Sequence, residues 1–205
     1  EYTANAFFKW LGQLVGEPHS ILVIAVVLVF IKWLFLKFLY DNVYIGGYDI
    51  RSDIKTYEWM EENYGMNIIK LAMVDEYLYH LDCSVFALNQ DQTLICTELY
   101  EEDEIKMLEK HTEIIDINAE DALGGLTNSV RMGNMILCAA NISEMKKTHE
   151  YYAGEKHKLE TLEKICGDAG MEPVIFNLSE FMKSGAMLSC MMMHLNRVDH
   201  NRTLL

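Results

Sequence analysis

From residue 43 onward, short apolar runs alternate with amphipathic stretches in a recurring pattern. "NVYIGGYDI" and "NIIKLAMV" are typical of strands. The stretch "SDIKTYEWMEENYG" between them has a candidate N-cap at Ser52, apolar residues at helical spacing and a terminating Gly65, so it predicts a helix. The same order is predicted twice more, with helices in "EEDEIKMLEKH" and "EKHKLETLEKICGDAG" and strands in "EIIDIN" and "PVIFNL".

Each of these units also begins with a predicted hairpin. The turns fall at Asp41-Asn42, in "NQDQ" and at Gly133-Asn134, and Gly46-Gly47 is expected to close a strand. Three β-β-α-β modules result, each too small to bury its own apolar face, so the sequence predicts an α/β repeat fold packed in a ring. We expect the central strands at residues 43–50, 84–97, 128–140 and 187–195.

The most apolar part of the chain is residues 20–40, "SILVIAVVLVFIKWLFLKFLY", which contains two charges, Lys32 and Lys37. It is just long enough to cross a bilayer, which takes about twenty residues. Its end belongs to the first predicted hairpin, so buried strands are expected, with a transmembrane helix or other membrane contact as the alternative. Residues 1–205 are expected to form a single domain in which residues 1–42 are a divergent, strongly apolar segment.

Composition narrows the classes of function. The 205 residues are 51% hydrophobic, which is enough for one domain with a core. A formal net charge of -14 repels polyanions, so no nucleic-acid partner is expected. The five cysteines are widely spread and form no CxxC pair, which fits neither a disulfide framework nor a zinc site. We therefore expect a reducing intracellular compartment, cytoplasmic or mitochondrial, and neither metal nor other cofactor.

Two short motifs contain residues that could carry chemistry. In "YHLDCS", expected at the start of a strand, His80 could act as a general acid/base with Asp82 setting its environment, or could be a half-buried structural histidine. In "SEFMKSGAMLSCMMMHLN", Cys190 could be a nucleophile or a buried core thiol among methionines. The pair becomes a minimal nucleophilic site only if the fold brings them together.

Five phrases in order carry a resemblance to a known superfamily. They are "YTANAF", "VYIGGYDIRSD", "VDEYLYHLDCSVFAL", "NAEDALGGLTNSVRMGN" and "SEFMKSGAMLSCMMMHLN". They resemble the signature blocks of the guanidino-group-modifying enzymes, which comprise amidinotransferases, arginine deiminases and dimethylarginine dimethylaminohydrolases. The resemblance is nearly continuous over residues 43–197. It implies an α/β propeller of the pentein type, built from β-β-α-β modules around a central substrate site.

The resemblance also implies roles for individual residues. Cys190 matches the nucleophile, and His80 matches the general acid/base in the family's H-x-D block, whose acid is Asp82. Arg51 aligns with an arginine that pairs with a substrate carboxylate, and Asn128 lies in a block near the rim of the active site. The implied substrate is an arginine-like small molecule whose guanidino group is hydrolysed or transferred.

Two departures from the family pattern leave a second function open. The family's acidic F-E-G-x-x-D block precedes the first hairpin, but the chain reads "IKWLF" there, and it has fewer modules than the complete ring. The propeller is therefore expected to be incomplete. The alternative to an enzyme is a catalytically degenerate relative that serves as a structural or interaction subunit of a larger complex, for example one in a mitochondrial membrane. Protein partners would then cover its open edges.

Overall fold

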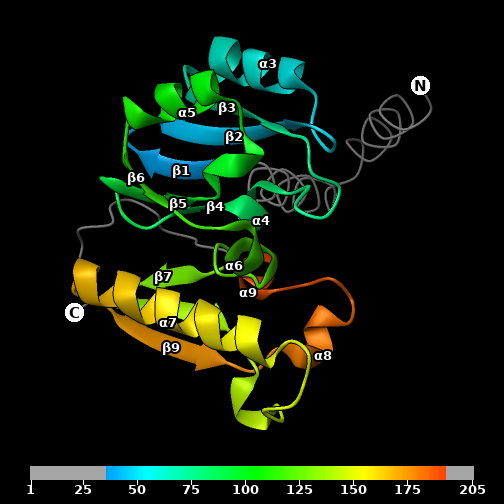
Figure 1. The fold of residues 1–205 in the computed structure, drawn as a ribbon. Helices are drawn as coiled ribbons and strands as arrows, with labels where there is room; N and C mark the ends of the chain where they lie inside the picture. The colour runs from blue at the N-terminus through cyan, green and yellow to red at the C-terminus, as the bar shows by residue number, and fades with distance from the viewer. Residues whose placement is uncertain (1–35, 193–205) are drawn as a thin grey trace, which may run out of the picture. The chain divides into compact units, whose positions relative to one another are not determined.

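The structure of the protein is a computed structural model that describes residues 36–192 (Figure 1). Most of the apolar segment at residues 20–40, and the end of the strand expected at residues 187–195, lie outside the described residues. Within the described range, no helix combines the length and apolar character needed to cross a membrane.

The described elements form three successive modules followed by two short helices. The first module contains β1 (Leu36–Tyr40), β2 (Val43–Asp49), α3 (Ile54–Tyr64) and β3 (Asn67–Met73). The second contains α4 (Leu81–Ser84), β4 (Val85–Ala87), β5 (Gln92–Ile95), the 3-10 turn η1 (Thr97–Leu99), α5 (Glu102–Glu109) and β6 (Glu113–Asp116). The third contains α6 (Ala119–Leu123), β7 (Val130–Met132), β8 (Met135–Ala139), η2 (Ile142–Glu144), α7 (Tyr152–Ala169) and β9 (Glu172–Phe176). The last two helices are α8 (Ser179–Met182) and α9 (Leu188–Met191).

The three modules share one topology. In each, the first two strands pair antiparallel, and a helix then crosses over to a third strand that pairs parallel with the second. The sheet orders are β1-β2-β3, β4-β5-β6 and β7-β8-β9. The described chain therefore has an α/β fold of separate mixed sheets built from β-β-α-β modules, as the repeating pattern predicted, and not one doubly wound parallel sheet.

The first module shows which local signals held. The Asp41-Asn42 turn joins β1 to β2 with Tyr40 paired to Val43, and Gly65 ends α3 in the left-handed region at φ 61°. The N-cap of α3 is Asp53 and not Ser52, because the Asp53 carboxylate accepts a hydrogen bond from the Lys55 backbone amide. The hairpin and the helix end were predicted correctly. The N-cap of the helix lies one residue later than predicted.

Gly46 and Gly47 lie inside β2 and do not close it, which corrects the sequence prediction. A Cβ at Gly46 would lie 2.9 Å from a methyl carbon of Ile68, and one at Gly47 would lie 2.9 Å from the sulfur of Met73. The hydroxyl of the buried Tyr57 also donates to the Gly47 carbonyl at 2.6 Å. These glycines let neighbouring side chains approach the strand backbone closely, so their role is packing.

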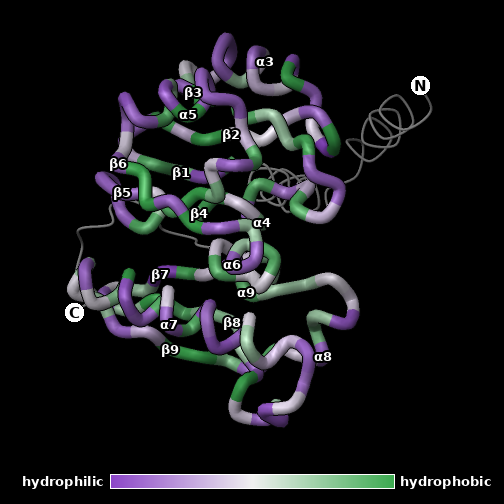
Figure 2. The backbone as a smooth tube through the Cα atoms, viewed as in Figure 1, coloured by the Kyte–Doolittle hydropathy of each residue, from purple (hydrophilic) through white to green (hydrophobic). Residues whose placement is uncertain are grey.

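Two apolar cores join neighbouring modules. One contains Leu39 and Leu71 of the first module with Val85 and Leu108 of the second. The other combines strands of the second and third modules with α7, and includes Phe86, Leu94, Ile136, Cys138 and Leu162. Figure 2 shows hydrophobic positions along these inner strands and hydrophilic positions on the outer helices. These two cores lie between modules, which agrees with the repeat interpretation.

Two segments expected as strand are helical. His80, Asp82 and Cys83 were placed at the start of a strand, but residues 81–84 form α4 and the strand begins only at Val85. Part of the strand expected at residues 187–195 is α9. Both helices have four residues, and tertiary contacts fix them more than local pattern does: Leu188 of α9 packs with Val130 and Leu137.

Candidate functional site

The helix α9 is held against the segment that enters β7. The Ser189 backbone amide donates to the Asn128 side-chain oxygen at 2.8 Å and contacts the Asn128 carbonyl at 3.1 Å. Ser189 and Asn128 are both buried, at 6% and 2% exposure. These bonds position the next residue, Cys190, so its placement depends on a segment about sixty residues earlier in the sequence.

The Cys190 thiol faces a carboxylate and an amide. Its Sγ lies 3.4 Å from Asp82 Oδ2 and 3.4 Å from the Asn128 side-chain nitrogen. The thiol is the donor toward Asp82, and Asn128 can donate back to the sulfur. Three of the five residues predicted for the site, Cys190, Asp82 and Asn128, are therefore in direct contact although they come from distant parts of the chain.

Asp82 is a buried carboxylate at the start of α4, with 3% exposure. Besides the thiol, its Oδ2 accepts a hydrogen bond from the Ser189 hydroxyl at 3.1 Å. The other oxygen, Oδ1, lies 4.0 Å from the Cys83 thiol. The Thr127 hydroxyl donates to the Cys83 carbonyl at 2.6 Å, which fixes α4 against the Thr127-Asn128 segment.

Sequence reasoning missed Lys37 and Ser189 as part of this site. Lys37 lies on β1, is 6% exposed, and its ammonium donates to the Ser189 hydroxyl at 3.1 Å. A charge within an otherwise apolar run was visible in the sequence, and it is the signal that could have identified Lys37. Its partner could not be found in this way, because 152 residues separate the two.

Electrostatics keep both thiols protonated at rest. Burial raises the pKa of the Cys190 thiol, and the neighbouring Asp82 carboxylate raises it further. Burial, with Asp82 as the next contribution, raises the pKa of Cys83 to about 12. A cation brought to Asp82 would oppose this effect, so the site is suited to a positively charged ligand.

His80 and Arg51 are linked to this cluster through neighbouring groups. His80 is the residue before α4, and burial lowers its pKa, with the Asp82 charge opposing and the Arg51 charge adding to that effect. The Tyr79 and His80 rings pack edge to face at 4.4 Å, and the Arg51 guanidinium lies 4.7 Å from the Tyr79 ring centroid. Arg51 is thus joined to His80 through an aromatic ring.

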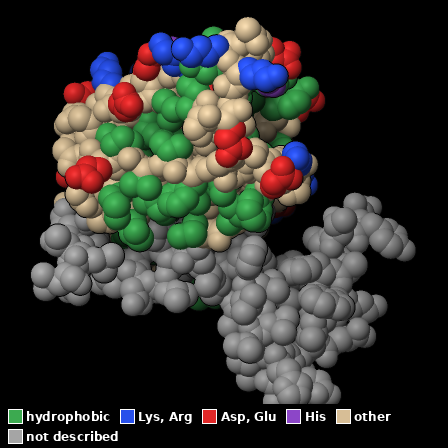
Figure 3. Space-filling view, turned by 90° about the horizontal axis from the view of Figure 1, so that it is seen from below, with side chains coloured by type: hydrophobic (Ala, Val, Ile, Leu, Met, Phe, Trp, Pro, Cys, Tyr) green, Lys and Arg blue, Asp and Glu red, His purple; other side chains and the backbone are tan. Residues whose placement is uncertain are grey.

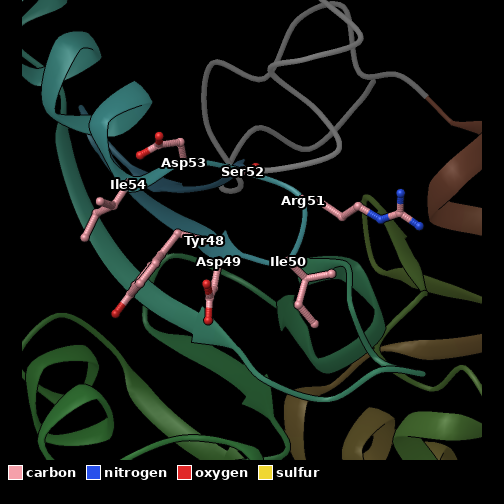
Figure 4. A pocket seen from close by; sticks show the side chains of 7 residues that line it. All are labelled: Tyr48, Asp49, Ile50, Arg51, Ser52, Asp53 and Ile54. Carbon is pink, nitrogen blue, oxygen red and sulfur yellow. The ribbon is translucent and has the colours of Figure 1, made fainter. Parts of the chain in front are cut away.

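Arg51 also lines an open pocket of about 490 Å³ formed by residues 48–54 (Figure 4). The Arg51 side chain extends away from the Asp49 and Asp53 carboxylates in this view. Asp49 adopts φ 95°, an unusual backbone conformation for a non-glycine residue, and its amide is bonded to the Ser52 carbonyl. Among residues 36–192, no group of three or more histidine, cysteine or acidic side chains could hold a metal ion.

Known proteins were compared with this chain by sequence and by structure. No protein-family model matches the sequence. The chain is 28% identical over 157 residues to the uncharacterized protein YkgA of Bacillus subtilis (strain 168), covering 77% of this chain and 49% of that protein. It therefore spans about half the length of the curated relative it matches.

Solved structures of similar fold include three informative ones. ArgZ, an arginine dihydrolase from the ornithine-ammonia cycle in cyanobacteria, matches with a TM-score of 0.61 and 19% identity over 76% of this chain and 22% of ArgZ. The N-terminal domain of ArgZ covalently bound to a reaction intermediate matches with a TM-score of 0.59 and 20% identity, covering 74% and 52% of the two chains. DDAH from Pseudomonas aeruginosa, as a cysteine mutant complexed with citrulline, matches with a TM-score of 0.54 and 16% identity, covering 76% and 52%.

These likenesses confirm the resemblance at the level of fold. The described chain has the fold of ArgZ, an arginine dihydrolase, and of DDAH. At these identities the comparison concerns the fold, and function has to be argued from the site itself.

Proposed function

We propose that this protein is a cysteine-dependent enzyme that hydrolyses or transfers the guanidino group of an arginine-like small molecule. The observation that carries the proposal is the contact of Cys190 Sγ with the Asp82 carboxylate at 3.4 Å, in a site assembled from α4, the Asn128 segment and α9. The sequence lacks the family's acidic block, but Asp82 provides a buried carboxylate beside the nucleophile.

A guanidinium group suits this arrangement chemically. Burying a cation costs several kcal/mol unless it is paired, and the Asp82 carboxylate can accept N–H bonds from the planar group. The same pairing brings the guanidinium carbon next to Sγ, at a distance set by the Cys190–Asp82 contact. Because the bound cation stabilises negative charge on sulfur, substrate binding promotes ionisation of the thiol.

His80 is proposed to move the protons. Its pKa is lowered, so the imidazole is neutral at pH 7 and can accept the Cys190 proton. Sγ then attacks the guanidinium carbon, the C–N bond to the departing amine breaks, and His80 returns the proton to that amine. The resulting amidino thioether is attacked by water, or by a second amine, with His80 removing a proton. Cleavage of the C–S bond regenerates the thiol.

Arg51 is proposed to bind the substrate carboxylate. Its guanidinium lies over Tyr79 at the pocket lined by residues 48–54, where a bidentate ion pair with a carboxylate is possible. An amino-acid substrate would then span from Arg51 to Asp82, with Asn128 orienting the sulfur. Among the proteins of similar fold, ArgZ is an arginine dihydrolase and DDAH was solved in complex with citrulline. Both observations support this substrate class.

The alternative is a structural or interaction subunit, and an exposed apolar surface favours considering it. Figure 3 shows hydrophobic side chains gathered on the face seen from below. Exposed large residues in the third module and beyond include Ile175, Phe176 and Phe181, at 41%, 41% and 52%. In this alternative the three modules are part of an incomplete propeller, and an intracellular protein partner covers the open edge.

Substrate assays decide between the two functions. The full-length protein is incubated with arginine, with dimethylarginine, or with arginine plus glycine, and citrulline and amidino-transfer products are measured. The enzyme proposal predicts turnover of at least one, and its loss in Cys190→Ser. Equal turnover by Cys190→Ser and the parent would remove Cys190 from the mechanism. No turnover of any of them would favour the structural subunit.

A further inference from the structure

A buried lysine lies behind the thiol and carboxylate of the candidate site. The Lys37 ammonium donates to Ser189 Oγ at 3.1 Å, and that hydroxyl donates to Asp82 Oδ2 at 3.1 Å. The ammonium and the carboxylate are therefore at most about 6 Å apart, within the range where opposite charges alter ionisation. All three side chains are buried, at 6%, 6% and 3% exposure for Lys37, Ser189 and Asp82.

We propose that Lys37, acting through Ser189, is the counter-charge that allows Cys190 to become a thiolate beside the Asp82 carboxylate. Lys37 is a positioning residue in this account: it contacts Ser189, and Ser189 is the residue that holds Asp82 toward the sulfur. This inference rests on the proposed function only where it concerns turnover of a guanidino substrate. Its effect on the thiol itself does not require a substrate.

A count of charges gives the physical reason. At rest the Lys37 ammonium balances the Asp82 carboxylate, and the thiol is neutral. During reaction the thiolate adds one negative charge to the buried site, the proton that Cys190 loses makes His80 cationic, and the guanidinium brings one further positive charge. Without Lys37 the thiolate would form next to an unbalanced carboxylate, which low-dielectric surroundings strongly disfavour.

Among residues 36–192, the other groups described at Cys190 bring no positive charge to it at rest. Asp82 faces it from α4 and opposes ionisation of both the Cys190 and the Cys83 thiols. His80 is the residue before α4, and burial favours its neutral form. Asn128 contributes an uncharged amide. The field of Lys37 reaches this cluster, since its charge acts to lower the pKa of the neighbouring Cys83 thiol.

The test measures the ionisation of Cys190 without substrate. Full-length protein is alkylated with iodoacetamide from pH 6 to 10, and modification of the Cys190 peptide is followed by mass spectrometry. Lys37→Met should raise the apparent pKa of Cys190 and slow its alkylation at pH 7 by about tenfold, because a shift of one pKa unit is a tenfold change in thiolate. Lys37→Arg should restore most of the rate.

The matched control is Lys156→Met, which removes one positive charge from an exposed ion pair on α7 and should leave the Cys190 profile unchanged. An unchanged profile in folded Lys37→Met would overturn the proposal. If Lys37→Met does not fold, Ser189→Ala decides: the proposal requires a profile shifted to higher pH, and an unshifted one contradicts it. Because no substrate is present, absence of guanidino turnover would not affect this result.

Discussion

The short helices α4 and α6 precede the hairpins of successive modules, and each contains a buried aspartate. The two carboxylates differ in their hydrogen-bond partners. Asp121 of α6 is bonded at 2.9 Å to His157 and at 2.9 Å to Thr161, both on α7. Asp82 of α4 contacts Ser189 at 3.1 Å and Cys190 at 3.4 Å, from the far end of the chain. The Asp121 carboxylate has two short side-chain bonds, and the Asp82 carboxylate faces a hydroxyl and a thiol at longer distances.

The buried lysines of these two regions differ in the same way. Lys158 of α7 donates to two backbone carbonyls, Gly124 and Ala139, at 2.9 Å each, and pairs with Glu155 at 2.7 Å. Lys37 instead donates to the Ser189 hydroxyl that contacts Asp82. Burial of a charge therefore does not identify a functional site in this fold. What distinguishes the candidate site is that the partners of Asp82 are a hydroxyl and a thiol at 3.1 to 3.4 Å, which a ligand could replace.

The largest expected difference concerns the two aspartates. Asp82→Asn should lower kcat/KM for the guanidino substrate by about 10²-fold or more, because it removes the carboxylate that pairs with the cation. Asp121→Asn should instead lower the free energy of unfolding by about 2 kcal/mol, through weakened bonds to His157 and Thr161, with kcat/KM nearly unchanged. Steady-state kinetics and urea unfolding of both variants measure the two quantities. Equal losses of kcat/KM in the two variants would contradict the difference proposed between the two aspartates.

A second effect concerns the buried lysine of the α6–α7 region and is measured by stability alone. Lys158→Met should lower the free energy of unfolding by about 3 kcal/mol, because Glu155 and two buried carbonyls lose their donor. The control Lys156→Met breaks an exposed pair with Glu160 and should leave the unfolding curve in place. If both substitutions had the same small effect, the Lys158 network would not be a structural anchor.

The smallest expected effect is a pH dependence in the α6–α7 region. The hydrogen bond and charge of Asp121 raise the pKa of His157 above its ordinary value in the folded state. Its stabilising contribution is therefore fully present below pH about 6.5, the unfolded value, and is lost as pH rises through the raised folded pKa. The melting-temperature difference between the parent and His157→Gln should be larger at pH 5.5 than at pH 8.5. A pH-independent difference would argue against the charged pair.

The parts of the fold that were predictable depend on local signals. The Gly133-Asn134 and Asp41-Asn42 turns, the Gly65 helix end and the alternation of apolar runs each specify a nearby conformation, so the β-β-α-β modules followed from sequence. The four-residue helices α4 and α9 were missed because contacts between distant segments set them.

The candidate site was predictable in its residue types and only partly in its contacts. Cys190, Asp82 and Asn128 were named from sequence phrases and meet in the structure. Asp82 was expected to act on His80, and its contacts with Cys190 and Ser189 were not foreseen. The connection of Lys37 to Ser189 spans 152 residues, and neither periodicity nor spacing contains it.

The central claim is that Cys190 attacks a guanidino carbon beside Asp82, and trapping the adduct tests it most directly. Full-length protein is mixed with arginine or dimethylarginine, quenched in acid during turnover, digested and examined by mass spectrometry. We expect the peptide that contains Cys190 to gain the mass of one amidino group or its N-substituted form, with Cys83 unmodified and no adduct in Cys190→Ser. Turnover that proceeds with no adduct on Cys190, or with the adduct on another residue, would contradict the account.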